Sequence, residues 1–203
     1  MKETNIQKIN LENLILISKS LKNHDCFVFY GTLLGLTRDN TIIRNDDDVD
    51  FLIDIKSKDI VLNKILSLTT FKINEEISNK YFTQFINFKD NIKTFVDFYF
   101  YIDENRDYIV EKHNWLSFVT SDKHSLHIPK KLIFPLKNSI KHDFVKLPNK
   151  QNELCEFLYG SSWLKPLEKN SEYRFEIENN RPKLIKRSFV GSLNRKIKKL
   201  FNN

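Results

Sequence analysis

The apolar residues of the first 40 positions change from helical spacing to short apolar runs. Residues 4–22 carry isoleucine and leucine at helical spacing behind a Thr-x-x-Gln capping box, which predicts an amphipathic helix. The aromatic and β-branched run 27–30 predicts a short strand that stops at Gly31-Thr32. Residues 33–38 predict a short helix whose first turn would present backbone N–H groups, an arrangement that attracts phosphate. If Gly31 merely ends a strand, no phosphate site follows.

Helical and strand-like patterns continue through the rest of the chain. Apolar spacing predicts one helix that turns Ile60, Val61, Ile65 and Leu68 inward. The elements expected after residue 40 are a loop over 40–45, an acidic strand, a helix over 57–68, strands over 81–88 and 92–101, short strands and loops over 107–147, a helix over 151–159 that ends at Gly160, and a loop over 161–166. With 203 residues, 40% of them hydrophobic, the chain can form one core with a small appendage.

The acidic strand begins with a cluster of carboxylates. Asp46, Asp47 and Asp48 are consecutive, and Asp50 follows Val49 directly before an apolar Phe-Leu-Ile run. Side chains alternate along a strand, so Asp48 and Asp50 would share one face while Val49 points into the core. Like charges a few ångströms apart repel by roughly 1 to 4 kcal/mol per pair, and a divalent cation is the usual means of offsetting this repulsion.

Asp97 is a second unusual acid, because it lies within the aromatic-rich strand 92–101. A buried acid there must meet a cation, a metal ion or hydrogen-bond donors, and a structural salt bridge is the simplest alternative to a site. A solvated acidic turn is the alternative for the cluster at 46–50. A calcium loop does not fit, because Phe51 stands where that loop needs Gly and Ser57 where it needs Glu. Hard oxygen ligands favour Mg²⁺ or Mn²⁺.

Charge separates the end of the chain from its body. The formal net charge is +7, yet residues 181–203 contain eight basic residues and no acid, which leaves the first 180 residues near −1. We therefore expect one electrically balanced domain over 1–180, a basic tail over 181–203, and no nucleic-acid partner. Within 188–203, apolar residues at helical spacing lie opposite basic residues, a pattern that suits an anionic membrane surface. The alternative is a terminal helix packed on its own domain.

Targeting signals and cysteines add little to this pattern. No run of about 18 uncharged apolar residues occurs, and the first ten residues lack the apolar core of a secretory signal. We expect a soluble cytoplasmic protein, with the tail as a peripheral contact to the inner face of the membrane. Cys26 and Cys155 lack metal-ligand spacing and are interpreted as two buried thiols.

The stretch 30–54 resembles the LicD/fukutin-type phosphotransferases. Their motif is close to G-T-L-L-G-x-x-R, a short spacer and I-P-W-D-D-D-I-D, and it is matched here by Gly31 to Arg38 and Ile43 to Asp50. The later segments that look similar are Val96-Asp97-Phe98, Phe134-Pro135-Leu136, residues 144–149, and Tyr159-Gly160 followed by Trp163 and Pro166. Order and spacing hold from roughly residue 24 to 167. Arg44-Asn45 departs from the motif, which usually has Pro and an aromatic residue there.

This resemblance implies an α+β protein, with a nucleotidyltransferase-type mixed β-sheet flanked by helices and followed by the basic helical tail. It implies transfer of a substituted phosphate, such as phosphocholine, from a CDP-linked donor such as CDP-choline to a sugar hydroxyl of a glycan or lipid-linked glycan. Asp48, Asp50 and Asp97 would be catalytic and would hold Mg²⁺ or Mn²⁺, with Asp97 alternatively acting as the general base. The expected substrate-binding residues are Tyr30, Gly31, Thr32, Arg38 and Asp47, where Arg38 would pair with a phosphate or bridge to the acids.

Three other functions remain open at this stage. A nucleotidyltransferase would share the fold but release pyrophosphate. A glycosyltransferase that holds its metal with an Asp-x-Asp pair would release UDP or GDP. A binding module would hold calcium structurally and turn over no nucleotide.

Overall fold

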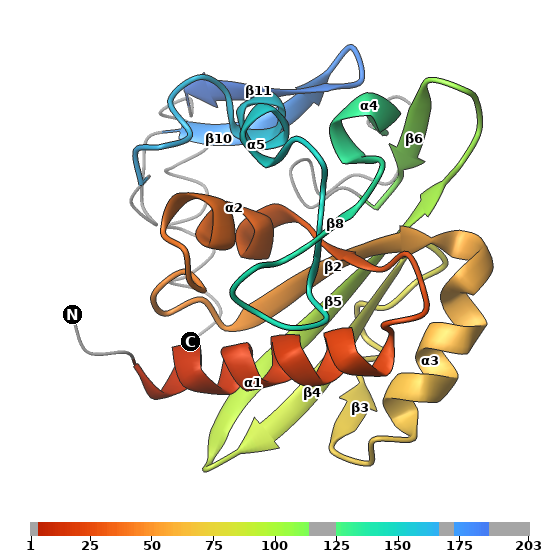
Figure 1. Cartoon of the computed structure of the whole chain (residues 1–203), viewed down its shortest axis with the longest axis vertical. Coiled ribbons are helices and arrows are strands. Elements are labelled where there is room, and N and C mark those ends of the chain that lie inside the picture. The colour runs from red at the N-terminus through yellow and green to blue at the C-terminus, as the bar shows by residue number, and fades with distance from the viewer. Residues whose placement is uncertain (1–3, 114–124, 167–172, 187–203) are drawn as a thin grey trace, which may run out of the picture.

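A mixed seven-stranded β-sheet with helices packed against it forms the body of the protein. The computed structural model describes residues 4–113, 125–166 and 173–186 (Figure 1). The strands of this sheet are β1 (Phe27–Val28), β2 (Asp48–Asp54), β3 (Phe71–Ile73), β4 (Phe82–Lys89), β5 (Ile92–Ile102), β6 (Tyr108–Glu111) and β7 (Leu126–Pro129). Their order is β1-β2-β5-β4-β3, with β6 joining β5 to β7. The β2–β5 pair is parallel and the other pairs of this sheet are antiparallel, so the predicted α+β class with a mixed sheet is confirmed.

Helices and two small hairpins surround the sheet. The helices are α1 (Asn5–Ser20), α2 (Tyr30–Arg38), the 3₁₀ turn η1 (Ile55–Ser57), α3 (Lys58–Leu66), α4 (Lys130–Ile133) and α5 (Gln151–Tyr159). The hairpins are β8 (Lys137–Asn138) with β9 (Lys146–Leu147), and β10 (Tyr173–Glu178) with β11 (Arg181–Lys186). Helix α1 contacts β5, and α2 lies between β2 and α5 (Figure 1).

The core confirms most of the apolar pattern. Val49 and Phe51 of β2 are buried, and Phe51 stacks on Phe98 of β5 with the ring centroids 5.4 Å apart. Such stacked aromatic pairs add to the free energy gained by burying apolar area. The Thr4 capping box of α1 is present as predicted, and α5 ends at Gly160, whose φ of 80° suits glycine.

Three sequence predictions need correction. Ile60 is 46% exposed, because the inward face of α3 is supplied by Val61 and Ile65. The first strand covers only Phe27–Val28, and α2 begins at Tyr30 rather than at residue 33. Tyr30 has a φ of 35°, a left-handed value that is uncommon for a residue with a side chain.

The predicted boundary between residues 180 and 181 falls inside the turn of the β10–β11 hairpin. Asn179 and Asn180 both have positive φ, the geometry of a tight hairpin turn, and Arg181 pairs with Glu178 in the ladder. Residues 181–186 are therefore a strand and not part of a helical tail. The rest of the predicted tail, residues 187–203, lies outside the described residues. Among the helices of the described ranges, none is both long and apolar enough to span a bilayer.

Candidate functional site

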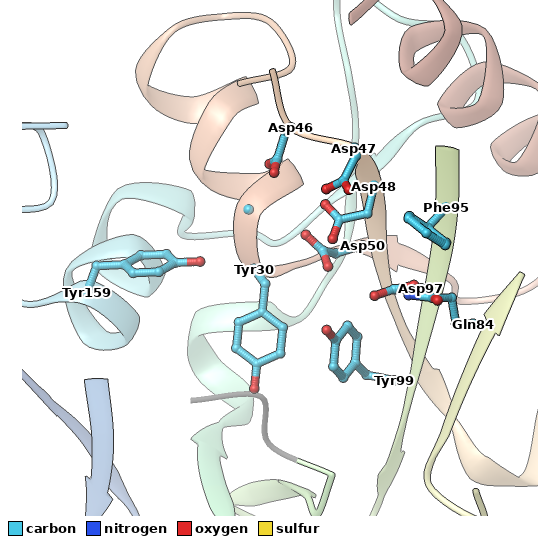
Figure 2. Close-up of a pocket in the computed structure, with 11 residues that line it drawn as sticks. Tyr30, Asp46, Asp47, Asp48, Asp50, Gln84, Phe95, Asp97, Tyr99 and Tyr159 are labelled. Carbon is cyan, nitrogen blue, oxygen red and sulfur yellow. Dashed lines mark hydrogen bonds between the residues drawn. The ribbon is translucent and has the colours of Figure 1, made fainter. Parts of the chain in front are cut away.

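A cavity of about 410 Å³ opens where the first residues of α2 meet β2 and β5. Its lining residues come from α2, the loop before β2, strands β2, β4 and β5, and the end of α5: Tyr30, Gly31, Asp46, Asp47, Asp48, Asp50, Gln84, Phe95, Asp97, Tyr99 and Tyr159. Five of these eleven are aspartates, and none is lysine or arginine. Figure 2 shows the aspartates gathered between Tyr159 on one side and β5 on the other. The cavity is therefore a site for positive charge.

Strand register brings Asp48, Asp50 and Asp97 together. Asp50 on β2 and Asp97 on β5 are direct partners in the parallel ladder, and Asp48 lies two residues before Asp50 on the same face. One carboxylate oxygen from each of the three residues lies within 4.8 Å of the other two. Asp46, Asp47 and Asp48 form a second such group at the mouth of the cavity. These acidic clusters could hold a metal ion, and an all-oxygen donor set suits Mg²⁺ or Mn²⁺.

Burial makes the carboxylates costly when no cation is bound. Asp50 is 5% exposed and Asp97 is 2% exposed. Burial, followed by the charge of Asp48, raises the pKa of both carboxyls well above the usual value. Within residues 4–113, 125–166 and 173–186, Asp97 has no cationic partner, and its carboxylate accepts from the Gln84 side chain instead of from a salt bridge.

The first turn of α2 holds Asp50 in place. The backbone N–H of Thr32 donates to Asp50 Oδ2 at 3.1 Å, and the backbone N–H of Asp50 donates to Thr32 Oγ1 at 2.8 Å. Thr32 is 2% exposed and does not line the cavity, so the structure places it behind Asp50 rather than against a substrate. The N–H that was expected to meet phosphate is thus paired with a carboxylate. This contact is favourable at a helix N-terminus.

Gly31 lies where the chain passes closest to the acids. A Cβ built at this position would lie 3.1 Å from Asp46 Oδ2 and 3.2 Å from Asp50 Oδ2, closer than ordinary van der Waals contact. A larger residue would push these carboxylates away. Gly35 has a similar role one turn later, because a Cβ there would lie 2.6 Å from the carbonyl oxygen of Thr41 in the loop before β2.

Tyr30 contributes its ring to the cavity, but its hydroxyl is directed elsewhere. Its OH donates to Glu111 Oε2 at 2.8 Å, and Figure 2 shows this hydroxyl on the side of the ring away from the acids. Glu111 is fully buried. Burial first, and then the neighbouring Glu111 charge, raises the pKa of Tyr30 well above its usual value, so the phenol stays protonated.

Arg38 does not reach the acid cluster. Its Nε and Nη2 donate to Asp39 Oδ1 and Oδ2 at 2.9 and 2.7 Å, and its side chain lines a separate cavity beside α5. The prediction that Arg38 bridges to the acids is therefore wrong. Asp47, the other charged residue expected to contact substrate, does line the acidic cavity and is exposed.

Gln84 and Tyr159 line the cavity but were not predicted from the sequence. Gln84 pairs with Asp97 in the β4–β5 ladder, and its Nε2 donates to Asp97 Oδ1 at 2.9 Å. The side-chain oxygen of Gln84, Oε1, accepts from Asn74 Nδ2 at 2.8 Å. A polar residue amid the apolar positions of β4 was the available signal for Gln84. Tyr159 could not be placed without the packing of α5.

Comparison with known proteins agrees with this geometry. A search of curated proteins found no match. Residues 23–150, well over half of the chain, match the family described as LicD/FKTN/FKRP, nucleotidyltransferase domain. Proteins of this family are generally metal-dependent transferases. The matched range contains α2, the acidic loop, and the β2–β4–β5 part of the sheet. The chain therefore belongs to the LicD/FKTN/FKRP nucleotidyltransferase-domain family.

Proposed function

We propose that the protein transfers a substituted phosphate, such as phosphocholine, from a CDP-linked donor to a hydroxyl of a cell-surface glycan or its precursor. The observation that carries this proposal is the meeting of Asp48, Asp50 and Asp97 in a cavity whose described lining contains no basic side chain. A donor diphosphate is itself negative and could enter such a cavity only together with a cation. The family match supports the transferase class.

Asp48, Asp50 and Asp97 would hold Mg²⁺ or Mn²⁺, each offering one carboxylate oxygen. When bound, the ion would orient the donor diphosphate and stabilise the charge that develops on the departing nucleotide phosphate. The missing side chain of Gly31 lets the Asp46 and Asp50 carboxylates approach the backbone of α2, and Gln84 Nε2 orients the Asp97 carboxylate by donating to it.

In the proposed reaction, the acceptor hydroxyl attacks the phosphorus that carries the transferred group. A new phosphorus–oxygen bond forms, the bond to the CMP phosphate breaks, and CMP leaves with that bond's electron pair. The hydroxyl proton must pass to a base. Asp97 is the candidate for this base as an alternative to its role as a metal ligand, because it lines the cavity and Gln84 Nε2 orients its carboxylate.

A nucleotide-release assay tests the proposal. The full chain is incubated with Mg²⁺, a glycan acceptor, and in turn CDP-choline, CDP-ethanolamine, CDP-glycerol, CDP-ribitol, CTP, UDP-sugars and GDP-sugars, and the products are separated by chromatography. CMP formed from one CDP-linked donor, and abolished by chelation, is the expected result. Pyrophosphate from CTP would instead show a nucleotidyltransferase, and UDP or GDP from nucleotide sugars a glycosyltransferase. Calcium binding without any turnover would show a binding module.

Asp54→Asn is a matched control for variants of the acids. Asp54 lies on β2 and on the same face as Asp50, but at the other end of the strand and outside the cavity. Its side chain accepts from the backbone N–H of Lys56, and an asparagine oxygen can replace that contact. CMP release should be unchanged in Asp54→Asn and lost in Asp48→Asn.

A further inference from the structure

A second cavity, of about 210 Å³, adjoins the acidic one. It lies between α2 and the turn that follows α5, and Tyr159 lines both cavities. In Figure 2 the Tyr159 hydroxyl points toward the aspartates. The two cavities therefore meet at the Tyr159 side chain, and an extended ligand that passes it would occupy both.

The second cavity is lined by apolar and basic residues, whereas the first is lined by acids. Trp163 and Tyr159 supply aromatic rings, and Leu34 and Ile43 supply aliphatic surface. The charged lining residues are Lys165 and Arg38, and the Arg38 guanidinium is already paired with Asp39. None of its described lining residues is an acid. A planar ring can stack on the aromatic surface while the Lys165 ammonium balances anionic charge beside it.

We infer that this second cavity binds the nucleoside end of a nucleotide-linked donor, whose diphosphate extends past Tyr159 to the acids. The inference rests on the proposed function, since it takes the diphosphate to lie at Asp48, Asp50 and Asp97. Trp163 stacks on the base. Lys165 attracts the phosphate nearer the nucleoside.

Two other parts of the reaction fit this cavity less well. A quaternary ammonium group, as in phosphocholine, would be repelled by Lys165, although aromatic rings alone attract such cations. A glycan acceptor needs several convergent hydrogen-bonding groups, whereas Leu34, Ile43 and Pro166 offer apolar surface. A nucleoside joined to phosphate matches both the aromatic rings and the positive charge of Lys165.

Binding of CMP in the presence of Mg²⁺ tests the inference without requiring turnover. The chain has two tryptophans, so a Trp115→Phe background leaves Trp163 as the only tryptophan emitter. We expect CMP to quench that emission in a saturable way, and choline phosphate not to do so. Calorimetry then compares CMP affinity in the full chain carrying Trp163→Ala or Trp163→Phe. Loss of base stacking should weaken binding roughly 10- to 100-fold in the alanine variant, and the phenylalanine variant should recover much of it.

Leu164→Ala is the matched control, because Leu164 lies in the same turn, is 62% exposed and does not line the cavity. If Trp163→Ala does not fold, Ser162→Glu places a negative charge at an exposed lining position, and it should weaken CMP binding while leaving the melting temperature unchanged. CMP affinity that is equal in wild type, Trp163→Ala and Ser162→Glu overturns the inference.

The two proposals fail in different ways. Binding of CMP that depends on Trp163, without transfer from any CDP-linked donor, would keep the nucleoside site and refute the proposed reaction. Transfer from a CDP-linked donor with unchanged CMP affinity in Trp163→Ala would keep the reaction and refute the nucleoside site.

Discussion

The substitution Asp50→Asn tests two effects of the acid cluster separately: the charge repulsion that lowers stability, and the metal binding that supports transfer. The substitution removes one charge and keeps the shape of the side chain. Because the Thr32 N–H donates to Asp50 Oδ2 at 3.1 Å, the asparagine carbonyl can still accept this hydrogen bond. The variant should therefore fold as the wild type does and should lose only what depends on the carboxylate charge.

The size of the effect follows from the spacing of the acids. One oxygen of Asp50 lies within 4.8 Å of an oxygen of Asp48 and of Asp97. At an effective dielectric constant of 20, two ionised carboxylates at that separation repel by about 3.5 kcal/mol. Asp50 avoids part of this cost, because its raised pKa lets it hold a proton for part of the time. We expect a net gain of about 1 to 3 kcal/mol on removing the charge, or roughly 2 to 10 °C in melting temperature for a chain of this length.

Thermal melts in EDTA and in Mg²⁺, run beside the CMP-release assay, measure both effects. In EDTA, Asp50→Asn should melt above the wild type. Mg²⁺ should stabilise the wild type and have little effect on the variant. Transfer should fall by about 10³-fold, because losing a metal's charge stabilisation costs several kcal/mol. Asp54→Asn should behave as wild type in every measurement. An Asp50→Asn protein that melts lower in EDTA, or keeps more than a tenth of its activity, would refute this reasoning.

Three further predictions follow from other groups. Asp97→Asn should abolish transfer without lowering the melting temperature, because the Gln84 amide can still donate to position 97 and the lost charge relieves repulsion as it does in Asp50→Asn; full specific activity with a large loss of stability would contradict this. His113 stacks on Phe82, and burial lowers its pKa to about 4, so the free energy of unfolding should fall by up to about 3 kcal/mol as pH drops from 6.5 to 4. Urea titrations of His113→Phe should show a shallower fall over this range, and an identical pH profile would exclude His113 as the cause. Deleting residues 188–203 should abolish binding to anionic liposomes at low salt and spare transfer to a soluble acceptor; full-length protein that ignores such liposomes would disprove the membrane role.

The placement of the acids could be predicted because it depends on local rules. Alternation along a strand puts Asp48 and Asp50 on one face, and the apolar run after them marks a buried strand. Asp97 stood out because an acid within an aromatic strand needs a partner. The parallel pairing of β2 with β5 sets Asp50 beside Asp97. This pairing could be seen only in the tertiary structure, because the sequence of a strand does not specify which strand it pairs with.

The hydrogen-bond partners of the polar groups near the site could not be predicted from the sequence. Thr32 follows Gly31 in a motif typical of phosphate contacts, yet both its N–H and its hydroxyl pair with Asp50. Arg38 is adjacent in sequence to Asp39 and pairs with it in a bidentate contact, so proximity along the chain decided its partner rather than the denser charge of the cluster. For both Thr32 and Arg38, the residue type limits the possible hydrogen-bond partners, and tertiary packing determines which partner is used.

Helix α1 carries a row of buried amides that explains why the acid cluster keeps its geometry. Gln7, Asn10 and Asn13 are three residues apart and buried, where apolar side chains would be expected. Gln7 Nε2 donates to the carbonyl oxygen of Ile42 at 2.9 Å, and Asn10 Nδ2 donates to that of Asp46 at 2.9 Å. Asn13 continues the row to Thr94 of β5.

These amides fix both ends of the loop that leads into β2. A free loop could relieve the carboxylate repulsion by moving Asp46 and Asp48 apart. Each amide contact holds a carbonyl that would be costly to leave unpaired, at about 1 to 3 kcal/mol when a partner is lost. The loop therefore retains its repulsion, and a bound cation is left as the main means of relieving it. In this way the polar face of α1, far from the chemistry in sequence, raises the affinity of the acidic cavity for positive charge.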